Sequence, residues 1–315
     1  MIISVILVSY NTAEMSVKSL HCLYASQGSF ELEVLVVDNA SKDSSVALIK
    51  QHFPQLTLIE NKTNVGFGRA NNQVLSLIKG DYVLLLNTDA FVEPDTLQKT
   101  LNHMQAHTKT GVLGVRLLGR DGVLQPACRY FPTPFNLFCQ RFGLNKWLPH
   151  IQLVDDLQWN PAITKACDWV PGCYYLVRKQ VIDEVGLFDP LYFLYYEEVD
   201  HCFAVKKAGW DVSYFAETSV VHIGGESAKS DQAISAKSRQ VESLQLESEL
   251  LYFRKNHGIT GLASATILML IGDLIQMLKD VLALQPWAKV KLSICHMCLL
   301  ASTLFITKFA TQSTR

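Results

Sequence analysis

The chain has 315 residues, of which 49% are hydrophobic and 18% are charged, and its formal net charge at neutral pH is −1. The length allows a large hydrophobic core and predicts one large domain, or one domain with an appendage. The small net charge excludes a global positive field, so nucleic acid is not an expected partner.

The N-terminus and the cysteines both favour a cytosolic protein. Residues 1–10 lack the charged and long apolar regions of a signal peptide, and we expect a strand there. The eight cysteines are scattered, and only Cys295 and Cys298 have the spacing of a metal or redox pair. This pair lies in an apolar run without a second pair, so buried free thiols in a reducing cytosol explain the cysteines better.

Short apolar runs alternate with helix-like segments in the first part of the chain. The runs predict buried strands at residues 2–8, 32–37, 56–60 and 82–86. Helices are expected at about residues 14–26, from residue 41 or 43 to about 51, and at about 64–79. This alternation indicates βαβ units, and therefore an α/β fold with a Rossmann-like, mainly parallel sheet and flanking helices.

Polar residues directly follow three of these strands. They are Tyr10 and Asn11, Asp38 and Asn39, and the run Asn87-Thr88-Asp89. Because right-handed crossovers bring the carboxyl ends of parallel strands to one edge, where open α/β sheets bind ligands, we expect these residues to converge. Asp89 is then a candidate ligand for a divalent cation that holds a nucleotide-sugar diphosphate. The alternative is that Asp89 caps the helix that begins near Pro94.

A glycine-containing turn at residues 64–72 opens the third helix. Gly66 and Gly68 allow the backbone to approach a ligand closely, and Arg69 could reach a phosphate. Asp38 could accept hydrogen bonds from a nucleotide base or a ribose. The turn lacks the third glycine and the strand-one position of a dinucleotide fingerprint, so it indicates NAD binding only weakly. An ordinary loop into a helix is the alternative.

The middle of the chain is less regular. We expect a strand at 111–117, a hairpin turn at 120–122 and a loop at 125–134. Residues 135–161 predict an irregular, aromatic-rich segment. This segment either borders the molecule that accepts a transferred sugar or is a surface excursion. Residues 168–177 predict a turn into a strand, with Trp169 and Gly172 on the acceptor side. A short helix ends at Gly186, and short strands are expected at 212–214 and 219–221.

Acidic residues and a histidine follow. Glu197, Glu198 and Asp200 begin a helix that runs to about residue 207, and the helix dipole alone would explain one or two of these carboxylates. His222 directly follows a strand and precedes two glycines, which would let an ion and phosphates come close. This setting favours a ligand over a structural histidine.

Six short motifs occur in a characteristic order. They are Val8-Ser9-Tyr10-Asn11, Val36-Val37-Asp38-Asn39-Ala40-Ser41, Asn64-Val65-Gly66-Phe67, Leu86-Asn87-Thr88-Asp89, Tyr196-Glu197-Glu198-Val199-Asp200 and His222-Ile223-Gly224-Gly225. In this order they resemble family 2 glycosyltransferases, most of all the bacterial branch that includes rhamnosyltransferases and galactofuranosyltransferases of cell-surface polysaccharides. The resemblance covers about residues 1–227.

The resemblance implies a GT-A fold, an inverting mechanism, a contact between Asp38 and the nucleotide base, and an Asp-x-Asp position at Asn87-Thr88-Asp89. Asn87 stands where aspartate is common and brings no charge, so metal binding falls to Asp89 and His222. Glu198 stands where the family has an aspartate base. Its side chain reaches one methylene further, so either the acceptor lies further away or Glu197 shares the role.

These residues predict a metal-dependent glycosyltransferase. Glu198 would take the proton of the acceptor hydroxyl, while Mn²⁺ or Mg²⁺ on Asp89 and His222 would neutralise the leaving nucleoside diphosphate. The expected donor is a dTDP- or UDP-sugar carrying rhamnose or another hexose, and the expected acceptor is a glycan or a polyprenyl-diphosphate-linked glycan of cell-surface polysaccharide synthesis. The residues predicted to bind the donor are Tyr10, Asn11, Asp38, Asn64, Gly66, Arg69, Asn87, Thr88 and Asp89.

Two other classes of protein are alternatives. A nucleotidyltransferase acting on sugar phosphates also uses a doubly wound sheet and acidic metal ligands. It would normally carry a glycine-rich basic loop after strand one, and residues 9–14 contain none. A non-catalytic sugar-binding module would not need Glu197, Glu198 and His222 together with Asp89.

The last third of the chain is rich in apolar residues. Residues 230–255 predict a long amphipathic helix, while the apolar runs at 262–271 and 292–307 are shorter than the roughly 17–25 residues of a membrane span. We expect interfacial or re-entrant helices, and two buried helices packed on the catalytic domain are the alternative. The predicted domains are a catalytic domain at 1–228, with a nucleotide-sugar half (about 1–117) and an acceptor half (about 118–228), and a membrane-associated helical region at 229–315. The expected location is the cytoplasmic face of the plasma membrane.

Overall fold

The computed structural model describes residues 1–148, 150–155, 159–224 and 238–315. The chain forms two compact units, and neither is one continuous stretch. The first comprises Met1–Arg129, Asp155–Pro190 and Glu197–Lys237, and the second comprises Tyr130–Val154, Leu191–Tyr196 and Ser238–Arg315. Two segments that we expected in the catalytic domain, 130–154 and 191–196, therefore group with the C-terminal helices.

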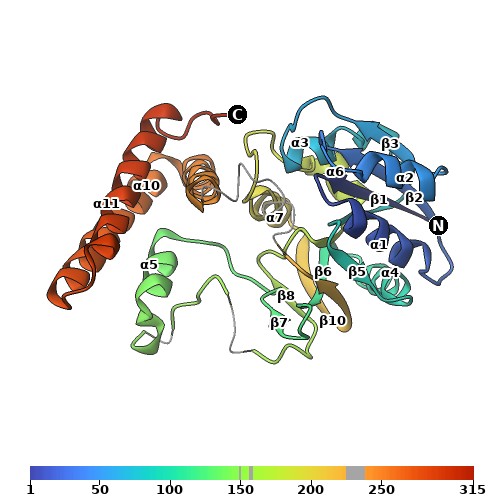
Figure 1. The fold of residues 1–315 in the computed structure, drawn as a ribbon. Coiled ribbons are helices and arrows are strands. Elements are labelled where there is room, and N and C mark those ends of the chain that lie inside the picture. The colour runs from blue at the N-terminus through green and yellow to red at the C-terminus, as the bar shows by residue number, and fades with distance from the viewer. Residues whose placement is uncertain (149, 156–158, 225–237) are drawn as a thin grey trace. The chain divides into compact units, whose positions relative to one another are not determined.

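A mixed sheet of ten strands forms the centre of the first unit (Figure 1). The strands are β1 Ile2–Ser9, β2 Glu31–Asp38, β3 Thr57–Glu60, β4 Tyr82–Leu86, β5 Ala90–Val92, β6 Thr110–Leu118, β7 Leu124–Gln125, β8 Lys165–Cys167, β9 Tyr174–Arg178 and β10 Asp211–His222. Their order is β3-β2-β1-β4-β9-β6-β10-β5, with β7 beside β6 and β8 beside β10. The strands predicted in the first part of the chain are confirmed, because apolar runs such as β4 are buried along their whole length.

The strand directions bring the carboxyl ends of β1, β2, β4 and β10 to one edge of the sheet. Strands β1 to β4 are parallel to their neighbours in this group. Strand β9 runs antiparallel to both β4 and β6, and β10 runs parallel to β6, so β10 points the same way as β4. Strand β5 is antiparallel to β10, and Ala90 pairs with His222. Asp89, which precedes β5, is thereby brought to the end of β10.

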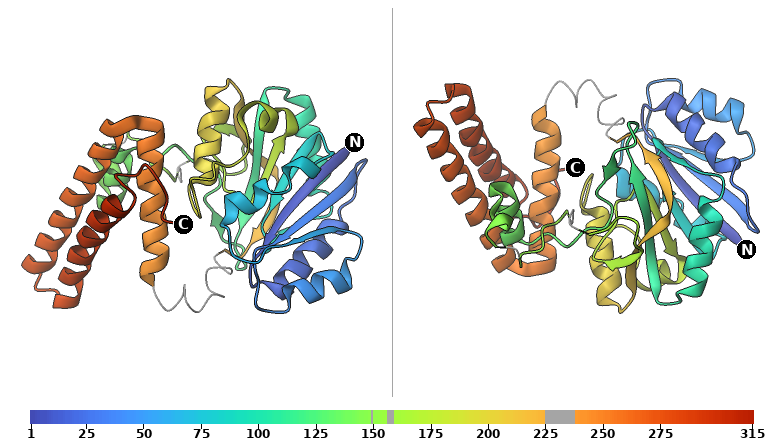
Figure 2. Two further views of the ribbon diagram at one scale, coloured as in Figure 1. Left: turned by 90° about the horizontal axis from the view of Figure 1, so that it is seen from above. Right: turned by 90° about the horizontal axis from the view of Figure 1, so that it is seen from below.

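Helices lie on both sides of this sheet (Figure 2). They are α1 Ala13–Tyr24, α2 Ser45–His52, α3 Phe67–Asn72, α4 Thr96–Ala106, α6 Lys179–Val185 and α7 Glu197–Lys207, and a 3₁₀ turn, η1, spans Leu75–Leu77. The third helix ends earlier than expected. The two short strands expected at 212–214 and 219–221 are one strand, β10, whose register against β6 shifts between Phe215 and Ser219.

The second unit consists mainly of helices. They are α5 Pro134–Phe142, the 3₁₀ turn η2 Leu144–Lys146, α10 Ser238–Leu282 and α11 Trp287–Ile306. The expectation of an irregular segment at 135–161 is wrong for α5. Thr133 and Asn136 form a capping box, and Pro134 occupies the first helical turn, where the missing N–H costs nothing.

Helix α10 is interrupted at Gly258, whose φ of 68° and ψ of −163° are not helical, and it packs against α11 (Figure 2). The amphipathic helix predicted at 230–255 is confirmed from Ser238 onward, and residues 230–237 lie outside the described residues. By length and composition alone, Val241–Leu282 and Trp287–Ile306 are apolar enough to cross a membrane. Both helices are longer than the apolar runs from which we expected interfacial helices.

Candidate active site

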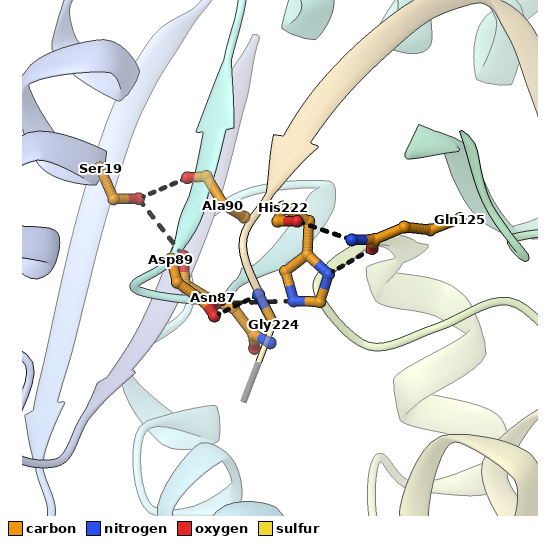
Figure 3. Close-up of polar contacts among 7 residues, drawn as sticks. All are labelled: Ser19, Asn87, Asp89, Ala90, Gln125, His222 and Gly224. Carbon is orange, nitrogen blue, oxygen red and sulfur yellow. Dashed lines mark hydrogen bonds and ion pairs between the residues drawn. The ribbon is translucent and has the colours of Figure 1, made fainter. Parts of the chain in front are cut away.

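Asp89 and His222 lie beside one another where β4 and β10 end (Figure 3). The Nε2 atom of His222 is 3.6 Å from Oδ1 of Asp89. The second carboxylate oxygen, Oδ2, accepts a 2.9 Å hydrogen bond from the backbone N–H of Gly224, and the Asp89 carbonyl accepts a 3.1 Å bond from the N–H of Ile223. These bonds tie the segment after β10 to the turn before β5. The two predicted metal ligands, Asp89 and His222, therefore lie side by side.

Gln125, at the end of β7, contacts the other side of the His222 ring. Its Oε1 atom lies 2.9 Å from Nδ1 of His222, and its Nε2 donates a 2.8 Å hydrogen bond to the His222 carbonyl oxygen. Burial lowers the pKa of His222, and the neighbouring Asp89 carboxylate opposes this shift in part. The imidazole is therefore mainly neutral at neutral pH, which leaves one ring nitrogen with a free lone pair.

The Asp89–His222 pair has donor atoms that suit a divalent cation. A carboxylate oxygen suits Mg²⁺ or Mn²⁺, and a neutral imidazole favours Mn²⁺. The 3.6 Å gap between the two atoms can accommodate an ion bound to each at about 2 Å. The described residues contain no cluster of three or more His, Cys, Asp or Glu side chains that could hold a metal. Diphosphate oxygens and water would therefore have to complete the coordination of an ion bound here.

Asp38 ends β2 at the same edge of the sheet and is 2% exposed. Its Oδ2 accepts a 2.9 Å hydrogen bond from the backbone N–H of Ser41. Its Oδ1 is buried and has no hydrogen-bond partner among the described residues. Leaving such an oxygen unpartnered costs free energy, so a ligand donor is the expected partner. Asn11 joins this turn to the end of β1, because its N–H donates to Ser41 Oγ at 2.9 Å and its Oδ1 accepts from the Lys42 N–H at 2.7 Å.

Asn39 holds the glycine turn beside Asp38. Its Nδ2 donates to Asn64 Oδ1 at 2.8 Å and to the Gly66 carbonyl at 3.3 Å, and its Oδ1 accepts from the Val65 N–H at 3.0 Å. Gly66 has a φ of 91°, a conformation that favours glycine. Asn64 and Gly66 thus lie near Asp38. Arg69 lies on α3, where its Nε donates a 2.8 Å hydrogen bond to the Pro190 carbonyl.

The two adjacent glutamates at the start of α7 have different surroundings. Glu197 is 3% exposed, and its Oε2 has no hydrogen-bond partner among the described residues. Burial and the nearby Glu198 charge raise the pKa of Glu197 well above its usual value. Burial also raises the pKa of Glu198, but its own backbone N–H, the Arg129 charge and the Gly172 backbone lower it. Glu198 is therefore the more easily ionised of the two.

Arg129 connects the predicted acceptor-side residues to Glu198. Its guanidinium carbon lies 4.3 Å from the centre of a Trp169 ring, and its Nε donates to Asp155. The backbones of Arg129 and Trp169 exchange hydrogen bonds of 3.1 and 3.2 Å. Trp169 is buried, and the positive charge of Arg129 lowers the pKa of Glu198. The stacked pair therefore lies close to the candidate base.

Gly172 and Cys173 link the candidate metal ligand to the candidate base. The Cys173 carbonyl accepts a 3.0 Å hydrogen bond from the Asn87 N–H, two residues before Asp89. A Cβ atom added to Gly172 would lie 4.0 Å from the carboxyl carbon of Glu198. Burial raises the pKa of the Cys173 thiol, and the charges of Asp89 and Glu198 raise it further. Both carboxylates therefore border this short segment.

The remaining predicted residues lie at the same edge. Tyr10 directly follows β1, and Thr88 is buried in the turn between β4 and β5. We did not single out Asn39, Gln125 and Arg129 as site residues from the sequence. Asn39 was expected only to converge with Asp38 at the shared edge, and its contact with the glycine turn was not predicted. No local pattern marks Gln125 or Arg129, because their contacts depend on how distant strands pair.

Comparison with protein families and curated proteins gives consistent matches. The family model described as glycosyl transferase family 2 matches residues 4–154. The chain is 26% identical over 220 residues to an N-acetylglucosaminyl-diphospho-decaprenol L-rhamnosyltransferase of Mycobacterium tuberculosis, covering 64% of this chain and 70% of that protein. It is 27% identical over 231 residues to the rhamnosyltransferase WbbL of Escherichia coli K12, covering 69% and 82%.

Solved structures match almost the whole chain at low identity. The mannosyltransferase PcManGT from Pyrobaculum calidifontis, in complex with GDP-Man and Mn²⁺, has a TM-score of 0.57 at 14% identity, covering 98% of this chain and 88% of that one. TarS 1–349 from S. aureus in complex with UDP has a TM-score of 0.51 at 16% identity, covering 100% and 93%. The chain spans 44% of a longer TarS chain.

At these identities the solved structures establish only the fold, and the implied GT-A fold is confirmed. The family model and the curated relatives establish the class of protein. Residues 4–154 match the glycosyl transferase family 2 model, and the curated relatives include rhamnosyltransferases, so the comparisons support a family 2 glycosyltransferase similar to the rhamnosyltransferase branch.

Proposed function

We propose that this glycosyltransferase is metal-dependent and inverting, and that it moves a hexose, rhamnose above all, from a nucleoside-diphosphate sugar to a hydroxyl of a glycan or lipid-linked acceptor. The carrying observation is the approach of Asp89 Oδ1 and His222 Nε2 to 3.6 Å at the carboxyl edge of the sheet. Glu198 borders the same site through Gly172 and Cys173.

Asp89 and His222 would hold Mn²⁺ or Mg²⁺, which supplies positive charge against the diphosphate leaving group when bound. Asp89 is oriented by the Gly224 N–H, so that its Oδ1 is directed toward His222. Asn87 and Thr88, in the same turn, would contact the ribose and diphosphate. Because Asn87 carries no charge, we assign it hydrogen bonding only.

The nucleotide would bind where β1 and β2 end. The Oδ1 of Asp38, which has no partner among the described residues, can accept a hydrogen bond from the imide N–H of uracil or thymine. The nucleotide would be surrounded by Tyr10, Asn11, Asn64 and Gly66. Arg69 would contact the donor near the glycine turn. These residues support a UDP- or dTDP-sugar as donor.

Glu198 is the proposed base. As an ionised carboxylate it would accept the proton of the acceptor hydroxyl as that oxygen attacks the anomeric carbon, and one displacement would invert the anomeric centre. Glu197 is buried, and its raised pKa favours the protonated form, which cannot accept that proton. Trp169 and Gly172 would border the acceptor.

The relatives guide the choice of acceptor. One of them is a rhamnosyltransferase named for an N-acetylglucosaminyl-diphospho-decaprenol, a lipid-linked diphosphate. We therefore propose a polyprenyl-diphosphate-linked glycan, or a related glycan, as the acceptor in cell-surface polysaccharide synthesis.

A membrane-surface location at the cytoplasmic face suits such an acceptor. The helices of the second unit expose large apolar side chains, among them Leu278, Leu282, Leu284, Trp287 and Phe305. Exposed apolar side chains of this density are typical of a surface that contacts lipid. We assign the catalytic domain to residues 1–228 and the membrane contact to residues 229–315.

The test is to incubate the purified full chain with a panel of dTDP- and UDP-sugars, with Mn²⁺ or EDTA, and to measure slow donor hydrolysis and transfer to a polyprenyl-diphosphate acceptor. Metal-dependent turnover of one donor is expected, with an inverted product anomer by NMR. Asp89→Asn is expected to lose most of it. In a parallel incubation with a nucleoside triphosphate and a sugar 1-phosphate, release of diphosphate with formation of a nucleotide-sugar would instead indicate a nucleotidyltransferase, and binding without turnover would indicate a sugar-binding module.

A further inference from the structure

The contact between Gln125 and His222 has no assigned role in the proposed chemistry. We propose that Gln125 is a positioning residue, which fixes the proton of His222 on Nδ1 so that the lone pair of Nε2 faces Asp89 and the cation between them. Because it concerns the same cation, the role of Gln125 rests on the proposed function.

The two hydrogen bonds of Gln125 define the orientation of its amide group. One amide atom lies 2.8 Å from the carbonyl oxygen of His222, and the other lies 2.9 Å from Nδ1 of the same residue (Figure 3). A carbonyl oxygen can only accept, so the amide NH₂ must face it. The opposite orientation would place two carbonyl oxygens against each other at 2.8 Å. The amide oxygen therefore faces Nδ1.

This orientation determines the tautomer of the ring. Since the amide oxygen can only accept, the Nδ1 atom of His222 must donate and carries the proton. A neutral imidazole has one N–H, so Nε2 keeps its lone pair. That lone pair faces Asp89 Oδ1 at 3.6 Å, which sets two electron-rich atoms opposite each other. Such a pair is unfavourable alone and favourable around a cation.

The sheet holds Gln125 and His222 in fixed positions. Gln125 pairs with Leu117 of β6, and Leu117 also pairs with Val220 of β10, two residues before His222. Strand β6 therefore lies between the strands that carry the two partners. Gly122, with a φ of 76°, closes the hairpin that places β7 there. A fixed second partner of this kind is what orients metal-ligating histidines in general.

Three variants of the full chain test this role. Gln125→Met keeps the length of the side chain and removes both hydrogen bonds. Gln125→Glu keeps an acceptor for the Nδ1 proton but loses the donor to the His222 carbonyl, so its second carboxylate oxygen must turn away from that carbonyl. The matched control is Gln98→Met, because Gln98 on α4 also makes two side-chain hydrogen bonds, to the Ser29 N–H and to Asn102.

The first measurement is the ¹⁵N chemical shifts of the histidine rings in metal-free protein with labelled histidine, with His222 assigned by its absence in His222→Gln. The second is Mn²⁺ affinity from the loss of the free-ion EPR signal. We expect Nδ1–H in the wild type, in Gln98→Met and in Gln125→Glu, and a mixture or Nε2–H in Gln125→Met. Mn²⁺ binding by Gln125→Met should weaken by about 10- to 100-fold, with recovery in Gln125→Glu.

Two results would overturn the role of Gln125: an Nε2–H tautomer in the wild type, or a Gln125→Met protein with wild-type ring shifts and wild-type Mn²⁺ affinity. Failure of the proposed function has a different signature. The wild type would then bind no Mn²⁺ and transfer no sugar, while the metal-free ¹⁵N shifts would still show whether Gln125 sets the tautomer.

Discussion

The guanidinium carbon of Arg129 lies 4.3 Å from the centre of a Trp169 ring, so the cation is held in place by the face of a buried indole. The same cation lowers the pKa of Glu198, which burial raises. Trp169 therefore positions a charge that favours the ionised form of the proposed base. This arrangement leads to a prediction about the pH dependence of turnover.

Arg129→Met should move the acid limb of the pH profile of kcat/KM to higher pH. The charge of Arg129 partly offsets the rise in the pKa of Glu198 that burial causes. Without this charge, the pKa of Glu198 rises further. The base is then protonated, and inactive, over a wider range of acidic pH, while rates at alkaline pH change less. The measurement is kcat/KM for transfer from pH 5 to 9, with exposed Arg120→Met as the control. An unchanged acid limb would show that Arg129 does not influence the pKa of Glu198.

Glu198→Gln and Glu197→Gln should have unequal effects. Glutamine cannot accept the acceptor proton, so Glu198→Gln should lower kcat by about 10²- to 10⁴-fold and leave donor affinity unchanged. Because Glu197 is buried and its raised pKa favours the neutral acid, its amide is a near-isosteric replacement and should change kcat only a few-fold. The measurements are kcat from steady-state kinetics and donor affinity from calorimetry, for both variants. The reverse ranking would assign the base to Glu197.

Asp38→Asn should weaken binding of the nucleoside diphosphate alone. The change replaces an acceptor oxygen, unpartnered in the described residues, with an amide that offers a donor to the base imide N–H. Loss of a hydrogen bond to a charged group costs about 1.5–3 kcal/mol, or about 10- to 100-fold in dissociation constant. Calorimetry with UDP and dTDP measures it, with Asp43→Asn as the control on the same turn. Equal affinity of the wild type and Asp38→Asn for UDP and dTDP would show that Asp38 does not bind the nucleotide base.

The double variant Leu284→Glu and Trp287→Glu should reduce binding to anionic lipid vesicles. Leu284, between α10 and α11, is 92% exposed, and Trp287, the first residue of α11, is 69% exposed. Transfer of each side chain into lipid contributes about 1.5–3 kcal/mol. Co-sedimentation of the full chain should fall at least about tenfold, while Val123→Glu, at a 61% exposed apolar position of the first unit, should not change it. Equal sedimentation of all three proteins would rule out a lipid contact at this position.

The strands and the polar residues at their ends were predictable from the sequence. A buried strand such as β4 is a continuous apolar run, and the handedness of βαβ crossovers determines which strand ends share an edge. The placement of Asp38 and Asp89 at one edge follows from these local rules, whereas His222 reaches that edge because β10 runs parallel to β6, beyond the antiparallel strand β9. The helix α5 was missed although its capping residues are local, because Pro134 was interpreted as a loop residue rather than as the first residue of a helix.

The sequence by itself thus determined the fold class, the edge of the sheet that carries the site, and the strand-end side chains that meet there, because apolar periodicity and chain chirality act over short stretches. Only the tertiary structure decided that Gln125 orients His222, that Arg129 acts on Glu198, and that residues 130–154 and 191–196 pack with the C-terminal helices. Those contacts depend on the register between distant strands and on which segments share a core, and no local pattern of residues encodes either.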